Sequence, residues 1–400
     1  MRLPCRKAPF ALLLVPLWLA ACGGGAGTDS AGTNASPSPA ATGTPSSRTT
    51  TPPPATAIQY SFAYVADDFS NTVSAYSISP ATGELTPVGL PVTAGNYPTQ
   101  VAVHPGGKFA YVSNTSYQGV SAYRINAATG ALTQIGATGD DSTNGTSSVA
   151  VDPGGNFLFV PNNYPSDSPF PPPQEPQSIS TWRIDADTGA LILASTVVTG
   201  RVIASIQVPR NGNVAYVKSE GPNFIAAYAI DPASGALTLL AATADGVGVG
   251  RIAAHPSGKF AYAASSAGSG PGEVSTYQLD PAAGTLTRQG SPVTTGVAPQ
   301  SIAVHPDGNL AYVANQNSND IWIYRIDAAS GALTPSGAPV SADNPKSIAF
   351  DPSGQFAYVG MTSGIQTYSV DAATGALTAV ATPVQRSRLA VSIATTRTTE

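Results

Sequence analysis

Three histidines are the residues in this sequence with the clearest capacity for chemistry, because imidazole can bind a metal ion or transfer a proton near neutral pH. His104, His255 and His305 each stand directly before the proline of a recurring turn such as His305-Pro306-Asp307-Gly308. Residues in the same position of repeated units are held apart from one another. We therefore interpret the three histidines as turn-capping side chains, and we expect no metal site.

Carboxylates are the second group that could do chemistry. Glu220 follows an apolar run and is expected near the rim of a central channel, where it could activate a water molecule as a general base. Asp67 and Asp68 form an adjacent pair that could help to bind a cation, but no calcium-binding loop motif surrounds them. We interpret this pair as solvated loop carboxylates.

Basic residues are few, and two of them, Arg251 and Arg388, could point toward the channel and attract an anion. Arg251 begins an expected innermost strand, and Arg201 lies on the same predicted face. The sequence contains no Gly-rich phosphate loop, no cysteine cluster and no Gly-x-Ser-x-Gly nucleophile elbow. We expect no cofactor.

The composition favours short strands and tight turns. Of 400 residues, 40 are Gly and 36 are Pro, whereas charged residues make up 10%. A helical bundle needs Glu, Lys and Leu in bulk and is excluded. With 18 basic residues against 23 acidic ones, the chain also lacks the dense positive surface that nucleic acid requires.

An internal repeat predicts the fold that positions these residues. A buried-type aromatic residue recurs at Tyr64, Tyr111, Phe159, Tyr216, Tyr262, Tyr312 and Tyr358. Each copy holds four short β-type runs, and seven such copies are typical of an all-β, seven-bladed β-propeller with four-stranded blades. The second run of each copy is apolar without alternation, as expected for a strand covered on both faces.

The two ends of the repeat region predict how the ring closes. The first copy begins at its second run, Ser61 to Val65, and lacks a first run of its own. A spare run, Leu389 to Ile393, stands near the C-terminus. Pairing the two would close the ring and remove exposed sheet edges, which a solenoid would have to cap instead. A closed ring needs no second subunit, so we expect a monomer.

The connections predict a working face. Two sets of tight turns lie on one face of the disc, and the connections on the other face vary in length and residue type, as functional loops do. The largest variation is a Pro-rich loop from Asn162 to Gln177 in the third copy. We expect a small-molecule or protein ligand to bind on this variable face.

The N-terminal segment predicts export. Residues 1–21 combine a basic start with a short apolar run and are typical of a signal peptide. Leu19-Ala20-Ala21-Cys22 resembles a bacterial lipobox, so Cys22 is the predicted lipidation site. We expect residues 22–57 to form a disordered tether, 58–395 the propeller and 396–400 a tail. The protein would then be lipid-anchored in the cell envelope, at the outer membrane.

The repeat region, about Ile58 to Thr395, resembles the β-propeller lactonase family, which includes 6-phosphogluconolactonases and muconate-lactonising cyclases. The resemblance rests on the run Pro299 to Gly308 and its continuation through Tyr312-Val313-Ala314-Asn315. It implies a site at the channel mouth, built from residues that begin the innermost strands and from a Glu after a second strand. The matching positions here carry Ser147, Ser148, Ala204 and Gln300, and Glu220 matches the acid.

The resemblance implies His and Arg at the starts of those innermost strands, and this sequence carries other residues there. This difference leads to three hypotheses. The first is an exported propeller that binds a ligand or protein through a degenerate lactonase site. The alternative is a lactone hydrolase with a remodelled site, in which Glu220 is the base and Arg251 or Arg201 stabilises the oxyanion. The third is a structural or adhesive module that uses the Pro-rich loop as its contact.

Overall fold

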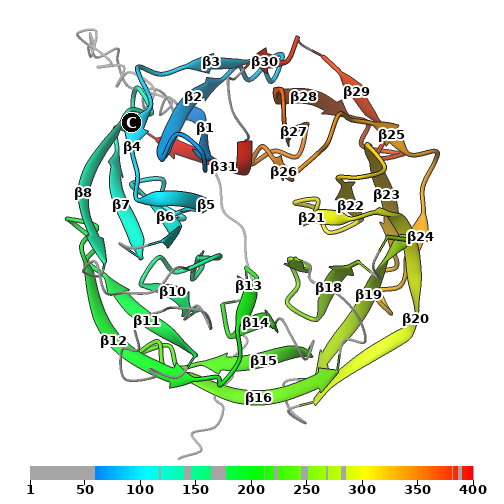
Figure 1. The fold of residues 1–400 in the computed structure, drawn as a ribbon, viewed down its shortest axis with the longest axis horizontal. Coiled ribbons are helices and arrows are strands. Elements are labelled where there is room, and N and C mark those ends of the chain that lie inside the picture. Colours follow the sequence, from blue (N-terminus) through cyan, green and yellow to red (C-terminus); the bar gives the residue numbers. More distant parts are fainter. Residues whose placement is uncertain are drawn as a thin grey trace, which may run out of the picture. The chain divides into compact units, whose positions relative to one another are not determined.

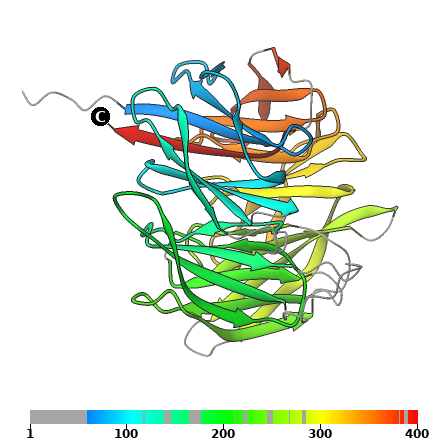
Figure 2. The same ribbon diagram turned by 60° about the vertical axis from the view of Figure 1, so that its left-hand side comes forward.

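The computed structural model arranges the strands of this chain in seven antiparallel sheets around a central axis (Figures 1 and 2). It describes residues 59–116, 119–138, 146–163, 177–210, 212–219, 224–244, 251–266, 269–280, 285–380, 382–385 and 390–399. These residues contain strands and turns and no helix. The prediction of an all-β, seven-bladed propeller is confirmed.

Each blade runs from an innermost strand at the axis to an outermost strand at the rim. Blade 1 consists of β31 (Ala390–Thr399), β1 (Gln59–Asp67), β2 (Thr72–Ile78) and β3 (Leu85–Pro87), with β4 (Val92–Thr93) continuing the rim. Blade 2 consists of β5 (Asn96–Val103), β6 (Phe109–Ser116), β7 (Val120–Ile125) and β8 (Leu132–Thr138). Blade 3 consists of β9 (Ala150–Val151), β10 (Phe157–Asn162), β11 (Ser178–Ile184) and β12 (Leu191–Val198).

The remaining blades follow the same order. Blade 4 consists of β13 (Ile203–Gln207), β14 (Val214–Ser219), β15 (Phe224–Ile230) and β16 (Leu237–Ala244), and blade 5 of β17 (Ile252–Ala254), β18 (Phe260–Ser265), β19 (Pro271–Asp280) and β20 (Thr285–Val297). Blade 6 consists of β21 (Pro299–Val304), β22 (Leu310–Asn315), β23 (Asp320–Ile326) and β24 (Leu333–Pro335), with β25 (Val340–Ser341). Blade 7 consists of β26 (Ser347–Phe350), β27 (Phe356–Met361), β28 (Gly364–Val370) and β29 (Leu377–Ala379), with β30 (Val384–Gln385).

The hydrophobic core lies between the blades. The buried residues form seven clusters, and each cluster combines side chains from two neighbouring blades. The second strand of each blade is apolar on both faces because both faces meet a neighbour, and β22 is buried along its whole length. One cluster joins Val65 and Ile393 of blade 1 to Tyr358 of blade 7, so the packing continues across the closure.

In five of the seven blades, the recurring tyrosine of the second strand also ties its blade to the next, whereas the buried hydroxyl of Tyr262 in blade 5 has no hydrogen-bond partner among the described residues. In those five blades, the tyrosine hydroxyl donates a hydrogen bond to the carbonyl of a turn glycine in the following blade. These bonds join Tyr64 to Gly130 (3.1 Å), Tyr111 to Gly189 (3.1 Å), Tyr216 to Gly258 (3.0 Å), Tyr312 to Gly375 (2.9 Å) and Tyr358 to Gly83 (3.1 Å). Blade 3 carries Phe159 at this position, and there the Thr181 hydroxyl donates to the Gly235 carbonyl instead (3.1 Å).

The ring is closed by the C-terminal strand, as predicted. β31 pairs antiparallel with β1, and Val65 lies opposite Ile393 (Figure 1). The expected end of the propeller at residue 395 is wrong, because β31 continues to Thr399, opposite Gln59. The segment expected to be a tail is Thr-rich, has high β-propensity and finds a paired backbone along the whole of β1.

Candidate functional site

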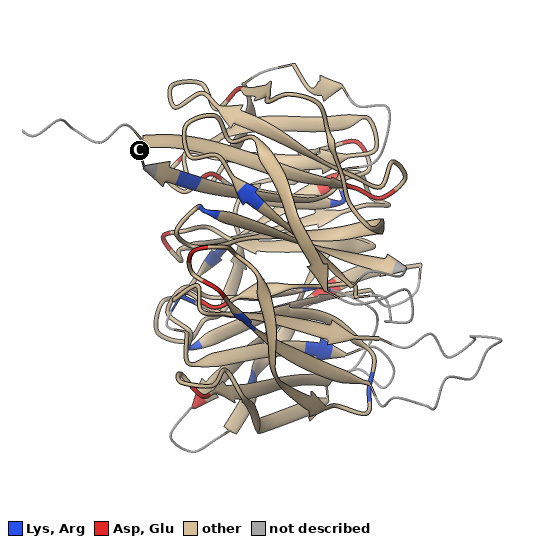
Figure 3. Ribbon diagram, turned by 90° about the vertical axis from the view of Figure 1, so that its left-hand side faces the viewer, with Lys and Arg blue, Asp and Glu red and all other residues tan. Residues whose placement is uncertain are grey.

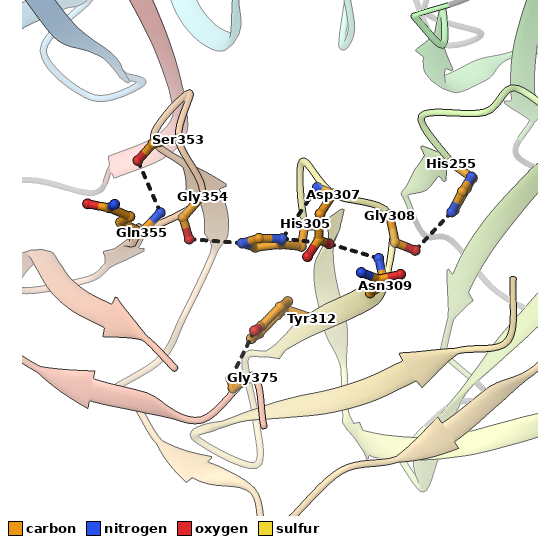
Figure 4. A network of polar contacts seen from close by, with 10 residues as sticks. All are labelled: His255, His305, Asp307, Gly308, Asn309, Tyr312, Ser353, Gly354, Gln355 and Gly375. Atoms are coloured by element: carbon orange, nitrogen blue, oxygen red, sulfur yellow. Dashed lines mark hydrogen bonds and ion pairs between the residues drawn. The ribbon is translucent and has the colours of Figure 1, made fainter. Parts of the chain in front are cut away.

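The three histidines hold turns together, as the sequence predicts. Nε2 of His104 lies 3.1 Å from the carbonyl of a turn glycine in the next blade. His255 and His305 make the same contact at 2.9 Å, with Gly308 and Gly354 (Figure 4). Nδ1 of His104 accepts the Gly106 N–H (2.9 Å), which caps its own turn. Burial lowers the pKa of His104. Each histidine therefore contributes to the inter-blade contacts on the turn face.

The innermost strands line two cavities in the central channel. Their volumes are about 290 and 270 Å³, and Gln207, Ala254, Ala303 and Val304 contribute to the walls of both. Each volume lies just below the range for sites of drug-sized ligands, about 300–1,000 Å³. The channel therefore suits a compact ligand that is smaller than such molecules.

Polar side chains from the innermost strands form a ring in this channel. The ring consists of seven equivalent positions, occupied by Ser392, Gln100, Ser148, Ser205, Arg251, Ser301 and Ser347. Five of the seven, Ser392, Gln100, Arg251, Ser301 and Ser347, line the larger cavity.

Most of these side chains link adjacent blades. The side-chain oxygen at this position accepts a hydrogen bond from a backbone N–H of the innermost strand in the next blade. Ser392 Oγ accepts the Val101 N–H (3.3 Å), and Ser148 Oγ accepts the Ile206 N–H (3.1 Å). Gln100 Oε1 accepts the Val149 N–H in the same way (3.3 Å). A guanidinium group has donors only and cannot make this bond. Arg251 therefore cannot accept the N–H that the side chains at this position accept in other blades.

Among the predicted site residues, the structure places Arg251 in the channel and not Gln300. Arg251 lines the larger cavity. Gln300 is the extra residue of a β-bulge between Pro299 and Ser301, so the lining role falls to Ser301. The bulge shifts the side chains by one position relative to the sequence-based expectation.

The two predicted serines are engaged in structural contacts. Ser148 is fully buried, and its hydroxyl donates to Gln100 Oε1 (2.8 Å). Ser147 Oγ donates to the Ile203 carbonyl (3.0 Å), next to Asn163 Nδ2, which donates to the same carbonyl (2.7 Å). This geometry favours a role in joining blades 3 and 4, and a ligand-binding role for either serine stays a prediction.

Arg201 is not among the residues that line the described cavities. Its guanidinium carbon lies 4.9 Å from the centre of the Phe224 ring, which starts β15, and the side chain is exposed. The structure therefore does not bring Arg201 into the channel cavity with Arg251.

Several predicted features lie outside the described residues. They are Glu220, Arg388, Cys22 with the signal peptide and tether, and residues 164–176 of the Pro-rich loop. In the described part of the chain, no helix has the length and apolar character needed to cross a bilayer.

The channel mouth carries a second cation, Lys346, which also lines the larger cavity. Burial lowers the pKa of Lys346, and the negative charge of Asp68 opposes this effect. Burial raises the pKa of Asp68, and backbone N–H groups and Lys346 oppose that rise.

The interpretation of Asp67 and Asp68 as solvated carboxylates is wrong, since Asp67 is 2% exposed and Asp68 is half-buried. Asp68 of blade 1 interacts electrostatically with Lys346, which precedes the first strand of blade 7, and the sequence of a single repeat unit does not reveal this contact.

The larger cavity has two cationic side chains in its wall. Its described lining includes Arg251 and Lys346 and no acidic residue, and Asp68 is the carboxylate that acts on Lys346. Elsewhere on the propeller, charged residues are sparse and scattered over turns and strands (Figure 3).

Sequence reasoning missed Lys346, Gln100 and Gln207 as lining residues. Aligning the repeats on the bulge would have identified Gln100, because it occupies the same column as Arg251.

The fold and the polar channel define a closed seven-bladed propeller with a cation-lined central cavity. The family model described as "Lactonase, 7-bladed beta-propeller" matches residues 40–141, 137–247 and 241–350, so the chain belongs to this lactonase family. No curated protein shows a significant match to the sequence.

Solved structures of the same fold are known from several bacteria. A proposed 6-phosphogluconolactonase from Bacteroides fragilis is 20% identical, with a TM-score of 0.68, and the match covers 84% of this chain and 98% of that one. A periplasmic gluconolactonase from Pseudomonas aeruginosa is 19% identical, with a TM-score of 0.66 and coverage of 85% and 99%. A protein from Lactobacillus plantarum is 20% identical, with a TM-score of 0.70 and coverage of 84% and 99%. At these identities the likeness concerns the fold.

Proposed function

We propose that the protein is an envelope-anchored binding module whose channel holds a small anionic polyhydroxy compound of the sugar-acid class. The observation that carries this proposal is Arg251. It occupies a position that in other blades accepts an N–H from the next blade, and it lines a cavity that also contains Lys346. An arginine there binds a carboxylate well, because its planar fork can form two parallel hydrogen bonds.

The rest of the lining suits hydroxyl groups. Gln100, Gln207, Ser301, Ser347 and Ser392 can each donate and accept hydrogen bonds. Membership of the lactonase family supports the same ligand class, since opening a sugar lactone produces a sugar acid. The similarity to a periplasmic gluconolactonase supports an envelope location, with Cys22 as the lipid anchor.

Replacing Arg251 with Gln is expected to weaken the binding of D-gluconate about 10- to 100-fold, since a hydrogen bond to a charged group contributes about 1.5–3 kcal/mol. Calorimetric titration of the full chain measures this change. Arg288→Gln is the matched control, because Arg288 is exposed on the outer strand β20. This variant should bind D-gluconate as tightly as the wild type does. Equal affinities in wild type and Arg251→Gln, or no gluconate binding at millimolar concentration, would overturn the proposal.

A lactone hydrolase is the second candidate. Glu220 and Asp68 hold the same position of the repeat, four residues after the buried tyrosine of the second strand. Asp68 lies near Lys346, which lines the channel cavity. The repeat therefore favours a place for Glu220 near the channel mouth, where a general base would be needed. Hydrolysis of D-glucono-1,5-lactone above the spontaneous rate, lost in Glu220→Gln and in Arg251→Gln, would support the hydrolase. Gluconate binding without such hydrolysis would support the binding module.

A further inference from the structure

The central channel has a second end, on the face that carries the tight turns. The innermost strands β13, β17, β21 and β26 all run from the variable face to a tight turn on the opposite face. The larger cavity includes Arg251 and Lys346, which precede β17 and β26. The smaller cavity, of about 270 Å³, includes Arg210, Pro256 and Pro306, which follow β13, β17 and β21. The two cavities therefore lie toward opposite ends of the same strands.

The walls of the smaller cavity are mostly apolar. Eight of its ten lining residues are Val, Pro, Ala or Phe, and the other two are Gln207 and Arg210. Phe350 is held in place, because its buried ring packs edge to face against the rings of His305 and Tyr312, with centroids 5.1 and 5.0 Å away. A compact apolar group suits these walls, whereas the hydroxyls of a sugar acid would face carbon atoms and lose hydrogen bonds to water.

The turn that carries Arg210 has a different sequence from its equivalents. The turns after the innermost strands of blades 2, 3, 5, 6 and 7 have His or Asp followed by Pro, whereas blade 4 has Pro209 followed by Arg210. The backbone is the same, because the Gly212 N–H donates to the Pro209 carbonyl and the Gly308 N–H to the His305 carbonyl, both at 2.9 Å. The same turn therefore forms with either pair of residues.

The exchange in blade 4 removes a side chain that caps the turn. In blade 7, Asp351 Oδ1 accepts the Phe356 N–H (2.8 Å). Proline has no side-chain acceptor, and the ring of Pro209 lines the smaller cavity instead. The link to the next blade is kept, because the Tyr216 hydroxyl donates to the carbonyl of Gly258 (3.0 Å), a turn glycine of blade 5. Blade 4 thus gains an apolar wall and a cation where other blades have a capping residue and a proline.

We propose that the turn-face end of the channel binds an apolar monocarboxylate, such as an aromatic or short aliphatic acid. Arg210 is exposed, lines the cavity and forms no hydrogen bond or ion pair with another residue that the structure describes. Its guanidinium can hold a carboxylate through two parallel hydrogen bonds. The apolar body of the acid then lies against residues such as Val208 and Pro256, where it is removed from water. This site is separate from the proposed gluconate site and does not rest on it.

Calorimetric titration of the full chain with benzoate tests the site. The wild type is expected to bind benzoate saturably, and to bind benzyl alcohol, which has the same ring without the charge, about tenfold more weakly. Arg210→Gln should weaken benzoate binding about tenfold for the same reason. Lys259→Gln is the matched control, because Lys259 is an exposed cation next to the equivalent turn of blade 5 and lines neither cavity. This control should bind benzoate as the wild type does.

A double variant separates binding from folding. Pro209→Asp with Arg210→Pro gives blade 4 the pair found at Asp152 and Pro153 in blade 3. The turn backbone already matches, so the double variant should have a thermal midpoint no lower than the wild type. It should lose benzoate affinity as Arg210→Gln does. A lower midpoint would show that Pro209 and Arg210 serve the fold, which contradicts the proposal.

The remaining outcomes distinguish this site from the gluconate site. Arg210→Gln should keep its affinity for D-gluconate, and Arg251→Gln should keep its affinity for benzoate. If benzoate does not bind at millimolar concentration, or binds equally to Arg210→Gln and the wild type, the turn-face site is wrong whatever the gluconate result. Equal binding of benzyl alcohol and benzoate, or weaker benzoate binding in Arg251→Gln or Lys259→Gln, would also overturn it.

Discussion

Deleting residues 390–399 is expected to abolish the folded propeller. These residues form β31, the innermost strand of blade 1, which pairs with β1 along its length. Ile393 belongs to the core cluster between blades 7 and 1, and Ser392 accepts the Val101 N–H of blade 2 (3.3 Å). Without β31, both neighbouring blades lose contacts and β1 becomes an exposed edge.

The size of this effect can be judged from one side chain. Truncating a buried isoleucine to alanine costs about 2–5 kcal/mol, against about 5–15 kcal/mol for the whole stability of a typical protein. Ile393→Ala should therefore lower the free energy of unfolding by about 2–5 kcal/mol while the protein still folds, and Ile393→Val by about 0.5–1.5 kcal/mol. Size-exclusion chromatography and urea unfolding measure both effects. A deleted chain that remains monomeric and unfolds cooperatively at the wild-type urea concentration would show that the ring does not depend on β31.

Cooperative unfolding at alkaline pH is the second large effect. Burial raises the pKa of the inter-blade tyrosines Tyr64, Tyr111, Tyr216, Tyr312 and Tyr358. Burial also raises the pKa of Tyr123 and of Tyr324 to about 12 each. A tyrosine in the unfolded chain titrates near pH 10. Between pH 10 and the higher folded value, the unfolded chain therefore binds fewer protons than the folded one.

The direction of the pH dependence follows from that difference. Stability is fully present below about pH 10 and falls as the pH rises through the folded pKa values. A pKa shift of two units corresponds to about 3 kcal/mol for each of Tyr123 and Tyr324. The contributions of all the buried tyrosines add up. The free energy of unfolding should therefore fall to zero before pH 12. Absorbance at 295 nm should show the buried tyrosines ionising together with the loss of near-ultraviolet circular dichroism. Gradual ionisation of all 16 tyrosines near pH 10 in a folded protein would contradict this account.

The fold was predictable because each repeat has the same local sequence pattern, which is enough to indicate a four-stranded blade. The aromatic of the second strand, the turn glycines and the apolar runs recur in register, so the blade count followed from the sequence. Closure followed from a missing first run at one end and a spare run at the other. The end of β31 was misplaced, because pairing to Thr399 depends on how far β1 extends toward Gln59, which no local pattern encodes.

The candidate site was predictable in part. Arg251 lines the channel cavity, where its position at the start of an innermost strand made it a candidate, and its catalytic role stays a prediction. The prediction of Gln300 as a lining residue was wrong by one position, because a β-bulge after Pro299 directs the side chain of Ser301 into the channel instead. The burial of Asp67 and the proximity of Asp68 to Lys346 arise between blades 7 and 1, at opposite ends of the chain. Such contacts emerge only when the ring closes.

A crystal structure of the full chain grown with saturating D-gluconate tests the channel assignment most directly. The account predicts electron density for the ligand inside the cavity, with its carboxylate within hydrogen-bonding distance of Arg251 or Lys346. Gluconate bound elsewhere on the molecule, with the channel holding solvent alone, would contradict it.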